Sequence, residues 1–327
     1  MKCVVSNGKG SLTFQANHPV VNPNNWPLWD VCFCGICKSD QHFVYQEGSK
    51  GLILGHEVVC RDDRGRYFVL NNEIACGRCE HCLEGETSHC RHLQELGVNR
   101  HGGYAEKIPA PRESLYRLTC RNKMIGVLAE PLACVFHALD RLARAVNLDG
   151  GKKVLIIGSG VSGKLLAHVL ITHYPMLSLS LYDIAAESMQ WASAFPSITR
   201  LTDIRDPAFP LVVECTGAPD GLAQGIAAVR NGGVLMLYGI QPEGTPLMIT
   251  AEEILFREIT VLPSRAGCSP DTFSRALAHL AAHQTFFDSM LGKVIPLEQL
   301  PGELRPGQAL QGTRTVIKIG SSQSADA

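Results

Sequence analysis

Four cysteines lie close together in the run CGRCEHCLEGETSHC, which extends from residue 76 to residue 90. They are Cys76, Cys79, Cys82 and Cys90, and their spacing is C-x2-C-x2-C-x7-C. A tetrahedral zinc ion bound by thiolates needs four sulfur atoms at about 2.3 Å from the metal. Two-residue spacers let one turn of backbone present three thiolates, and a short loop brings back the fourth. The run therefore predicts a structural zinc site, which stabilises part of the fold and performs no chemistry itself.

An iron–sulfur cluster is the main alternative for this run, because such clusters also use Cys-x2-Cys-x2-Cys segments. Arg91 follows the last cysteine, where ferredoxin runs usually have proline, and the sequence has no second run of this kind. The other alternative is that the thiols are small buried apolar side chains. Zinc is the favoured interpretation.

A second group of candidate ligands precedes the cysteine run, in the segments CGICKSDQHF (34–43) and LILGHEVV (52–59). Cys37, His56 and Glu57 offer a soft, a borderline and a hard donor. Such a mixed set suits a zinc ion with one position open for substrate, which is the arrangement of catalytic sites. Taken alone, these residues would more often be ordinary side chains. Their position just before the cysteine run favours a metal.

Another carboxylate lies at the start of a predicted helix. The segment LAEPLACVFHALDRL (128–142) is amphipathic at helical spacing, and Pro131 suits the first turn. Glu130 directly precedes this proline, where a carboxylate either caps the helix or reaches a metal.

A glycine-rich turn follows the apolar run KVLII, which is typical of a parallel strand buried on both faces. The turn is GSGVSG (158–163), and the helical segment KLLAHVLITHY comes next. In this context Gly158 permits the tight turn, Gly160 lets the backbone approach a pyrophosphate, and Gly163 lets helix and strand pack closely. The start of the helix also offers free N–H groups to the phosphates.

Asp183 ends the next predicted strand, twenty residues after Gly163. A carboxylate at this place accepts hydrogen bonds from a ribose 2′-hydroxyl and repels a 2′-phosphate. The residues after it, Ile184 to Ala186, offer no cation for such a phosphate. The sequence therefore favours NAD over NADP.

The elements that position these residues differ between two parts of the chain. The first 70 or so residues have short alternating apolar segments with prolines between them, which predicts turn-rich β structure. From Lys153 strands alternate with helices, which predicts a parallel sheet with right-handed crossovers. We expect later strands at 211–217, 232–240, 259–264 and 313–320, a helix at 272–282 and a disordered tail at 321–327.

Composition narrows the class of protein. The chain has 327 residues, which suits two domains, and a formal net charge of −1, which argues against nucleic acid or an anionic membrane as the main partner. Its 13 cysteines without a secretion signal indicate reduced thiols and metal ligands. The N-terminus has no signal-peptide pattern, and no apolar run is long enough for a membrane helix. We expect a cytoplasmic protein.

With these residues collected, the chain resembles the zinc-containing medium-chain dehydrogenases, such as alcohol, sorbitol and threonine dehydrogenases. The resemblance covers essentially the whole chain and rests on CGICKSD, GHE, the four-cysteine run, AEPL, GSGVSG with Asp183, and ECTG, in the family's order. It implies an α/β fold with a GroES-like β-barrel catalytic domain and a Rossmann domain with a doubly wound parallel sheet. The implied boundaries are 1–135 and 266–327 for the catalytic domain with its zinc sites, and 136–265 for the NAD-binding domain.

The same resemblance assigns roles to individual residues. Cys37, His56 and Glu57 resemble the catalytic zinc ligands of the polyol branch. Glu130 occupies a position where that branch binds zinc directly or through a water molecule, so Glu57 and Glu130 would exchange as the metal changes coordination. The implied cofactor-binding residues are Gly158, Gly160, Val161, Gly163, Asp183, Cys215, Thr216, Gly239 and Arg265.

The resemblance also implies a proton path. Zinc makes a bound hydroxyl lose its proton more easily, and hydride then passes to the nicotinamide ring. Ser39 would take the hydroxyl proton and His42 would relay it to solvent. The alternative for His42 is an exposed loop histidine. Lys38 stands where the family usually has glycine, and it is either a contact for an anionic substrate or a solvated lysine.

The predicted function is NAD-dependent and zinc-dependent oxidation of a secondary alcohol on a polar small molecule: a polyol, sugar acid, cyclitol or amino alcohol. We expect two zinc ions per chain and a homodimer or homotetramer. The alternatives are an NADPH-dependent ketone reductase of a biosynthetic pathway, and a non-catalytic zinc- and NAD-binding regulatory protein.

Overall fold

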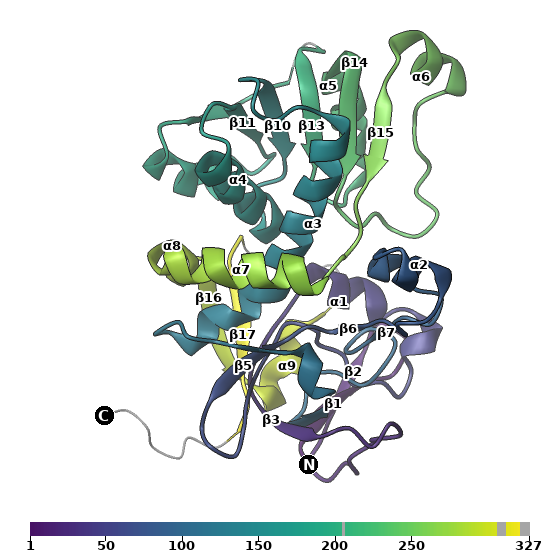
Figure 1. Ribbon diagram of the computed structural model, residues 1–327, viewed down its shortest axis with the longest axis vertical. Helices are drawn as coiled ribbons and strands as arrows, with labels where there is room; N and C mark the ends of the chain where they lie inside the picture. Colours follow the sequence, from purple (N-terminus) through teal and green to yellow (C-terminus); the bar gives the residue numbers. More distant parts are fainter. Residues whose placement is uncertain (205–206, 306–311, 321–327) are drawn as a thin grey trace. The chain divides into compact units, whose positions relative to one another are not determined.

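A computed structural model describes residues 1–204, 207–305 and 312–320 (Figure 1). The expected disorder of the tail 321–327 lies outside these residues. The chain forms two compact units, one made of residues 1–133 and 267–327 and the other of residues 134–266. None of the helices in the described part of the chain has the length and hydropathy needed to span a bilayer.

The first unit is built on a seven-stranded sheet with the order β16-β17-β3-β4-β5-β9, in which β8 also pairs with β3. All of these pairings are antiparallel except that of β16 with β17. The strands are β3 (Leu28–Gly35), β4 (Val58–Arg61), β5 (Tyr67–Leu70), β8 (Lys107–Pro109), β9 (Leu115–Arg117), β16 (Leu291–Pro296) and β17 (Arg314–Lys318). Much of the predicted turn-rich β structure thus belongs to this sheet, which also includes β17, the last strand among the described residues.

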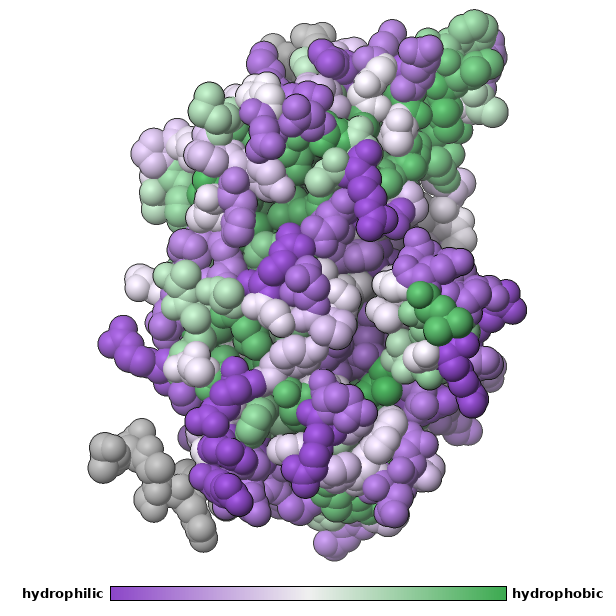
Figure 2. Space-filling model, in the orientation of Figure 1, coloured by the Kyte–Doolittle hydropathy of each residue, from purple (hydrophilic) through white to green (hydrophobic). Residues whose placement is uncertain are grey.

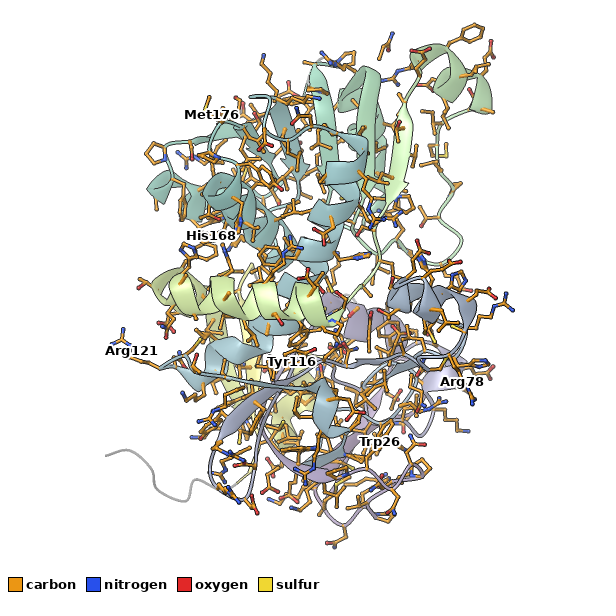
Figure 3. All side chains as sticks on the ribbon, in the orientation of Figure 1. Trp26, Arg78, Tyr116, Arg121, His168 and Met176 are labelled. Carbon is orange, nitrogen blue, oxygen red and sulfur yellow. The ribbon has the colours of Figure 1, made fainter. Side chains whose placement is uncertain are left out.

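Two short antiparallel strand pairs and several helices complete the first unit. The paired strands are β1 (Cys3–Ser6) with β2 (Leu12–Gln15), and β6 (Glu73–Ile74) with β7 (Gln94–Glu95). The helices are α1 (Lys38–Phe43), α2 (Glu80–Leu83), α7 (Pro270–Ala282), α8 (Gln284–Ser289) and α9 (Leu300–Glu303). Tyr116 of β9, labelled in Figure 3, packs its ring 4.8 Å from that of Phe273 on α7. The helix α3 (Ala129–Ala145) begins in this unit.

The second unit has a six-stranded parallel sheet with the order β12-β11-β10-β13-β14-β15 (Figure 1). Its strands are β10 (Lys153–Ile157), β11 (Ser178–Tyr182), β12 (Ile198–Leu201), β13 (Phe209–Glu214), β14 (Val229–Leu237) and β15 (Thr260–Pro263). Its helices are α4 (Val161–His173), α5 (Pro219–Ala228) and α6 (Ala251–Arg257). Four consecutive residues of β10 are buried, as expected for a parallel strand covered on both faces.

Several expected element boundaries differ from the observed ones, such as that of the strand expected at 232–240, which is β14 (Val229–Leu237), and two of the differences have identifiable reasons. The strand predicted at 211–217 ends at Glu214, because the Glu214 carboxylate accepts hydrogen bonds from the N–H groups of Thr216 (2.6 Å) and Gly217 (3.0 Å) and turns the chain. The helix predicted at 272–282 begins two residues earlier, at Pro270. Ser269 caps it by accepting a hydrogen bond from the Thr272 N–H at 3.2 Å.

Candidate active site

The pairing of β3 with β4 brings the first set of candidate ligands together. Gly35 at the end of β3 donates its N–H to the carbonyl of Glu57 at 2.9 Å, and Glu57 directly precedes β4. Cys37 lies two residues after β3, at the N-cap of α1. The Cys37 thiol, a His56 ring nitrogen and a Glu57 carboxylate oxygen all lie within 4.8 Å of one another. A thiol, an imidazole and a carboxylate at this separation fit a zinc ion.

Asp40 contacts two of the three candidate ligands, His56 and Cys37. Its Oδ1 lies 3.4 Å from Nδ1 of His56, and its Oδ2 accepts hydrogen bonds from the Tyr104 hydroxyl (2.6 Å) and the Cys37 N–H (2.9 Å). Asp40, His56 and Tyr104 are all buried. Burial alone would lower the pKa of His56, but Asp40 and Cys37 together outweigh it and raise that pKa well above its ordinary value. A carboxylate on Nδ1 fixes the imidazole so that Nε2 faces a metal.

Arg314 from β17 pairs with the Glu57 carboxylate inside the same buried region. Its Nη2 lies 2.8 Å from Oε1 of Glu57, and its Nη1 donates to the Ile36 carbonyl at 2.7 Å. Burial raises the pKa of Glu57 to about 8, although Arg314 opposes this shift. For Cys37, burial acts upward but Arg314 and His56 outweigh it, so that its pKa is lowered to about 7. The cluster therefore favours a thiolate ligand beside a carboxyl group that is already shared with a guanidinium.

Glu130 is not one of the converging ligands beside Cys37, although its charge reaches Arg314. It is buried in the first turn of α3, and its Oε1 is 3.9 Å from the Cys268 thiol. Among the described residues, the ligand atoms that converge beside Cys37 are those of His56 and Glu57, and Glu130 is not in that group. Its charge nevertheless helps to raise the pKa of Arg314.

The two residues predicted to move a proton lie on α1. The Ser39 hydroxyl is 3.4 Å from Nε2 of His56, so it is at the candidate metal cluster. His42 is half-buried, and its Nε2 lies 3.0 Å from the side-chain nitrogen of Gln46. The structure places Ser39 at the ligands, and places His42 one helical turn further along.

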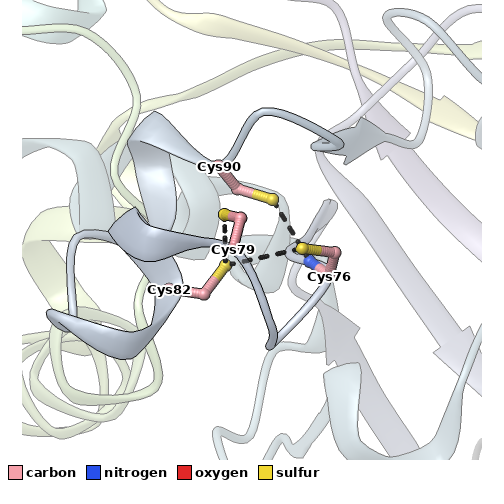
Figure 4. Close-up of side chains that lie close together, drawn as sticks. All are labelled: Cys76, Cys79, Cys82 and Cys90. Atoms are coloured by element: carbon pink, nitrogen blue, oxygen red, sulfur yellow. Dashed lines mark hydrogen bonds between the residues drawn. The ribbon is translucent and has the colours of Figure 1, made fainter.

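The four cysteines of the second candidate metal site form a compact group (Figure 4). Their sulfur atoms all lie within 4.8 Å of one another, with Cys79 to Cys82 at 3.5 Å and Cys76 to Cys82 at 3.9 Å. The Cys90 sulfur also accepts hydrogen bonds from the N–H groups of Cys76 and His92, each at 3.3 Å. Four thiols at these distances have the geometry of a closed tetrahedral zinc site.

In the second unit the glycine turn has the features that a bound dinucleotide needs. Gly158 has a positive φ of 104°, which side-chain residues rarely adopt. A Cβ atom on Gly163 would lie 1.9 Å from the Gly158 carbonyl oxygen, whereas one on Gly160 would meet nothing within 4 Å. Gly163 is therefore needed for close packing, and the backbone at Gly160 is open to a ligand. Val161 is the first residue of α4.

Asp183 follows β11, which lies beside β10, and contacts the glycine turn directly. Its carboxylate accepts hydrogen bonds from the Ser159 N–H at 2.6 Å and the Ala185 N–H at 2.9 Å. Burial lowers the pKa of Lys164 in α4, the helix that follows the glycine turn, and the Asp183 charge opposes this shift. The carboxylate is thus held in place at the edge of the sheet where the glycine turn lies.

The remaining predicted cofactor residues also follow the strands of this sheet. Cys215 and Thr216 come directly after β13, Gly239 comes after β14, and Arg265 is exposed after β15. A Cβ atom on Gly239 would lie 2.2 Å from the Gly217 nitrogen, so these two turns are in close contact. The carboxyl ends of the strands in a parallel sheet share one edge, which is where such sheets bind ligands.

Four supporting residues were missed from the sequence. Asp40 lies within the motif CGICKSD and Glu214 lies within ECTG. For these two residues, the available signal was an acidic residue inside a motif that also contains candidate site residues. Glu214 also accepts a hydrogen bond from the Gln241 amide at 3.0 Å and so joins two turns of the second unit. Tyr104 and Arg314 are distant in sequence from the residues that they support, and no local pattern indicates them.

Comparison with known proteins places the chain in a family. A family model described as a zinc-binding dehydrogenase matches residues 187–282, and one described as an alcohol dehydrogenase GroES-like domain matches residues 24–119. Together they match more than half of the chain. The chain belongs to the zinc-containing medium-chain dehydrogenase family. The predicted family and the predicted fold class, a GroES-like domain with a Rossmann parallel sheet, are confirmed.

Individual relatives agree with this assignment. D-arabinitol dehydrogenase 1 of Uromyces fabae is 25% identical over 322 residues, with 89% of each chain covered. Sorbitol dehydrogenase of Halalkalibacterium halodurans is 27% identical, with 72% of this chain and 75% of the relative covered. The crystal structure of L-idonate 5-dehydrogenase from Escherichia coli superposes with a TM-score of 0.81 at 22% identity, covering 97% of this chain and 98% of the other. The chain is thus an oxidoreductase of the alcohol dehydrogenase class that uses a nicotinamide cofactor.

Proposed function

We propose that the chain oxidises a secondary alcohol of a polar small molecule with NAD, using a zinc ion held by Cys37, His56 and a carboxylate. The observation that carries this proposal is the convergence of Cys37, His56 and Glu57, with Asp40 behind the imidazole. The relatives named D-arabinitol, sorbitol and D-altritol 5-dehydrogenase act on polyols, which supports a substrate with several hydroxyl groups. Relatives named L-threonine 3-dehydrogenase support an amino alcohol as the second class.

Each residue around the cluster would have a separate role in such a reaction. Zinc bound there would lower the pKa of a substrate hydroxyl. Asp40 would keep Nε2 of His56 directed at the metal. Arg314 would hold the Glu57 carboxylate in an ion pair, whether or not Glu57 is bound to the metal. Ser39, 3.4 Å from His56, would take the hydroxyl proton, and His42 on the same helix would pass it on to solvent. Glu57 and Glu130 are the two candidates for the carboxylate ligand.

For the cofactor, we propose NAD in preference to NADP. The Asp183 carboxylate is fixed beside the glycine turn by two backbone N–H groups, so it is placed for a ribose hydroxyl and would repel a phosphate. A protein of Sinorhizobium meliloti 1021, described as a candidate zinc-binding dehydrogenase and solved with NADP, is similar to this chain at 25% identity, with a TM-score of 0.81 and coverage of 97% of this chain and 98% of that one. Turnover measured with NAD and with NADP discriminates between the two cofactors.

A panel of polyols, sugar acids, cyclitols and amino alcohols tests the proposal, with NAD and NADP compared at each substrate and zinc fully loaded. We expect turnover of at least one such alcohol with NAD. The Asp183→Ala variant should narrow the difference between the cofactors, because it removes the repulsion of the 2′-phosphate. Activity restricted to ketone reduction with NADPH would support the reductase instead. Binding of NAD without turnover of any alcohol would support a regulatory protein.

For the reaction and the fold we also propose two zinc ions, one at the Cys37–His56–Glu57 cluster and one at the four-cysteine cluster, and assembly into a homo-oligomer. The support for assembly is the edge strand β15 and the exposed apolar residues near it, which form a hydrophobic area over α6 (Figure 2). Leu255 and Phe256 of α6 have exposed fractions of 71% and 76%. Light scattering on the wild type and on a Leu255→Lys/Phe256→Lys variant measures this, since loss of the apolar area should favour the monomer.

A further inference from the structure

The loop that joins the cysteines carries three more side chains of metal-binding type. They are His81 on α2, Glu86 in the turn that follows, and His89 in the 3-10 helix η2 (Thr87–His89). One ligand atom from each lies within 4.8 Å of the others. This His81–Glu86–His89 cluster uses none of the four thiols, and neither the fold nor the proposed reaction accounts for it.

Backbone hydrogen bonds fix the spacing of the cluster. The Glu86 N–H donates to the His81 carbonyl at 2.7 Å, and the His89 N–H donates to the Glu86 carbonyl at 3.0 Å. Cys79 is the N-cap of α2, and Cys90 is the C-cap of η2. Because the thiol cluster holds both ends of this loop, the two histidines and the glutamate are brought together on a segment of restricted conformation.

The distances in the cluster are close to those between ligands of one metal ion. Nδ1 of His89 is 3.3 Å from Oε2 of Glu86, and Nδ1 of His81 is 3.9 Å from the same oxygen. Two ligands bound tetrahedrally at about 2.0–2.1 Å from zinc lie about 3.3–3.4 Å apart. The Glu86–His89 pair already has this separation. His81 would have to move by about half an ångström to reach it.

The surroundings of His81 indicate which of its nitrogens is available. Its Nδ1 atom is buried and makes no hydrogen bond in the described part of the chain, although the side chain as a whole is partly exposed. Its Nε2 atom lies 3.6 Å from Oε1 of Glu80, which is also paired with Arg91. His81 therefore offers Nδ1 to the space that it shares with Glu86 and His89.

We propose that His81, Glu86 and His89 bind a zinc ion that is separate from the four-thiol site. Two imidazoles and one carboxylate are a known ligand set for zinc with an open fourth position. Because the three side chains are partly exposed, the ion would exchange more readily than one enclosed by thiolates. Its binding would link α2 to η2. It would stabilise the segment of residues 76–90, which we call the lobe, by an amount that rises with the logarithm of the free zinc concentration above Kd.

Matched variants of the full chain test the proposal. Glu86→Gln removes one ligand, and Glu84→Gln makes the same change at an exposed residue of the same loop outside the cluster. Equilibrium dialysis against zinc should show one more ion per chain in the wild type and Glu84→Gln than in Glu86→Gln. Since loss of a supporting residue alone weakens metal sites by about 10–100-fold, loss of a ligand should weaken this one by at least about 100-fold.

A second pair of variants checks the identity of the ligands, and cobalt separates the two metal sites. His89→Gln should lose the extra ion, whereas His92→Gln should keep it, because His92 lies outside the cluster. With Co2+ in place of zinc, the thiol site should give thiolate charge-transfer absorption, and the extra ion should not add to it. Circular dichroism of each variant shows whether the lobe has kept its structure.

Three results would overturn the proposal: a wild type that binds no more zinc than Glu86→Gln, equal loss of the ion in Glu84→Gln, or loss in His92→Gln with retention in His89→Gln. In the first case the contacts among the three side chains are only solvent-exposed ion pairs. None of these outcomes depends on catalytic turnover, so the cluster is tested independently of the proposed reaction.

Discussion

The two thiol-containing clusters of the first unit are built in opposite ways. The four cysteines of the lobe all come from residues 76–90, and backbone N–H groups support Cys90. The other cluster, which we call the pocket cluster, joins Cys37, His56 and Glu57. Its supporting side chains come from as far away as Arg314, and they are buried. A site assembled from one local segment serves a local fold, whereas a site assembled from several strands depends on the whole unit.

The two clusters also differ in what shifts the pKa values of their thiols: groups of the same short segment in the lobe, and a distant arginine in the pocket cluster. In the lobe, backbone N–H groups, first that of Cys82, lower the pKa of Cys79 to about 6. Burial and hydrogen bonds to neighbouring thiols raise the pKa of Cys82 to about 12. Thiols that are this close oppose one another's ionisation until a dication is bound. In the pocket cluster a positive charge is already supplied by Arg314, which lowers the pKa of Cys37 without a metal.

Removal of a ligand from the pocket cluster should have the largest effect on turnover. We expect Cys37→Ser to lower kcat/KM by about 10³-fold, because a metal ion supplies several kcal/mol of stabilisation to the reacting oxygen and each 1.36 kcal/mol is a factor of ten. Cys32→Ser is the matched control, because Cys32 lies on β3, just before Cys37, and outside the cluster. Steady-state kinetics and zinc content measure both. Full activity of Cys37→Ser would show that the reaction does not use this cluster.

Arg314 gives the next largest effect, on stability. Arg314→Met removes the guanidinium partner of the buried Glu57 carboxyl group and raises the pKa of that group further, and breaking a buried ion pair costs up to about 3–5 kcal/mol. Urea denaturation of the metal-free chain measures this. The double variant Arg314→Met/Glu57→Gln should recover much of the loss, because it no longer buries an ionisable carboxyl group without its partner. Equal losses in the single and double variants would show that Arg314 acts through packing alone.

Asp40 should have an intermediate effect, on metal binding. Asp40→Asn weakens the support of His56, and such changes lower metal affinity by about 10–100-fold. Tyr104→Phe removes only the hydroxyl that donates to Asp40, so we expect a smaller loss of affinity from it. Competition with a chelator measures zinc retention in both variants, and the thiol site provides an internal reference. An unchanged affinity in Asp40→Asn would mean that the backbone alone orients His56.

The same contrast explains what the sequence could predict. The lobe was predicted from spacing because its ligands are neighbours in the chain, and the glycine turn with Asp183 was predicted because strand, turn and helix follow one another. Arg314 could not be predicted as a partner of Glu57, because their contact depends on β17 pairing with β3. Glu130 is expected at the catalytic metal from the family resemblance; in the structure it lies beside Cys268, and its charge acts on Arg314. Its role as a ligand stays a prediction.

The lobe should show the smallest effect on turnover and a clear effect on stability. In Cys82→Ala one of four thiols is lost, and metal that binds only the folded state no longer stabilises it. Each kcal/mol lost should lower Tm by about 2–4 °C in a unit of this size. At a temperature where the variant is folded, kcat/KM should stay within about threefold of the wild type, a difference below 1 kcal/mol. Cys120→Ala, a buried cysteine outside both clusters, controls for loss of a thiol. A Cys82→Ala protein with normal Tm and no turnover would reverse the assignment of the two clusters, because the local site would then be the one that acts on the substrate.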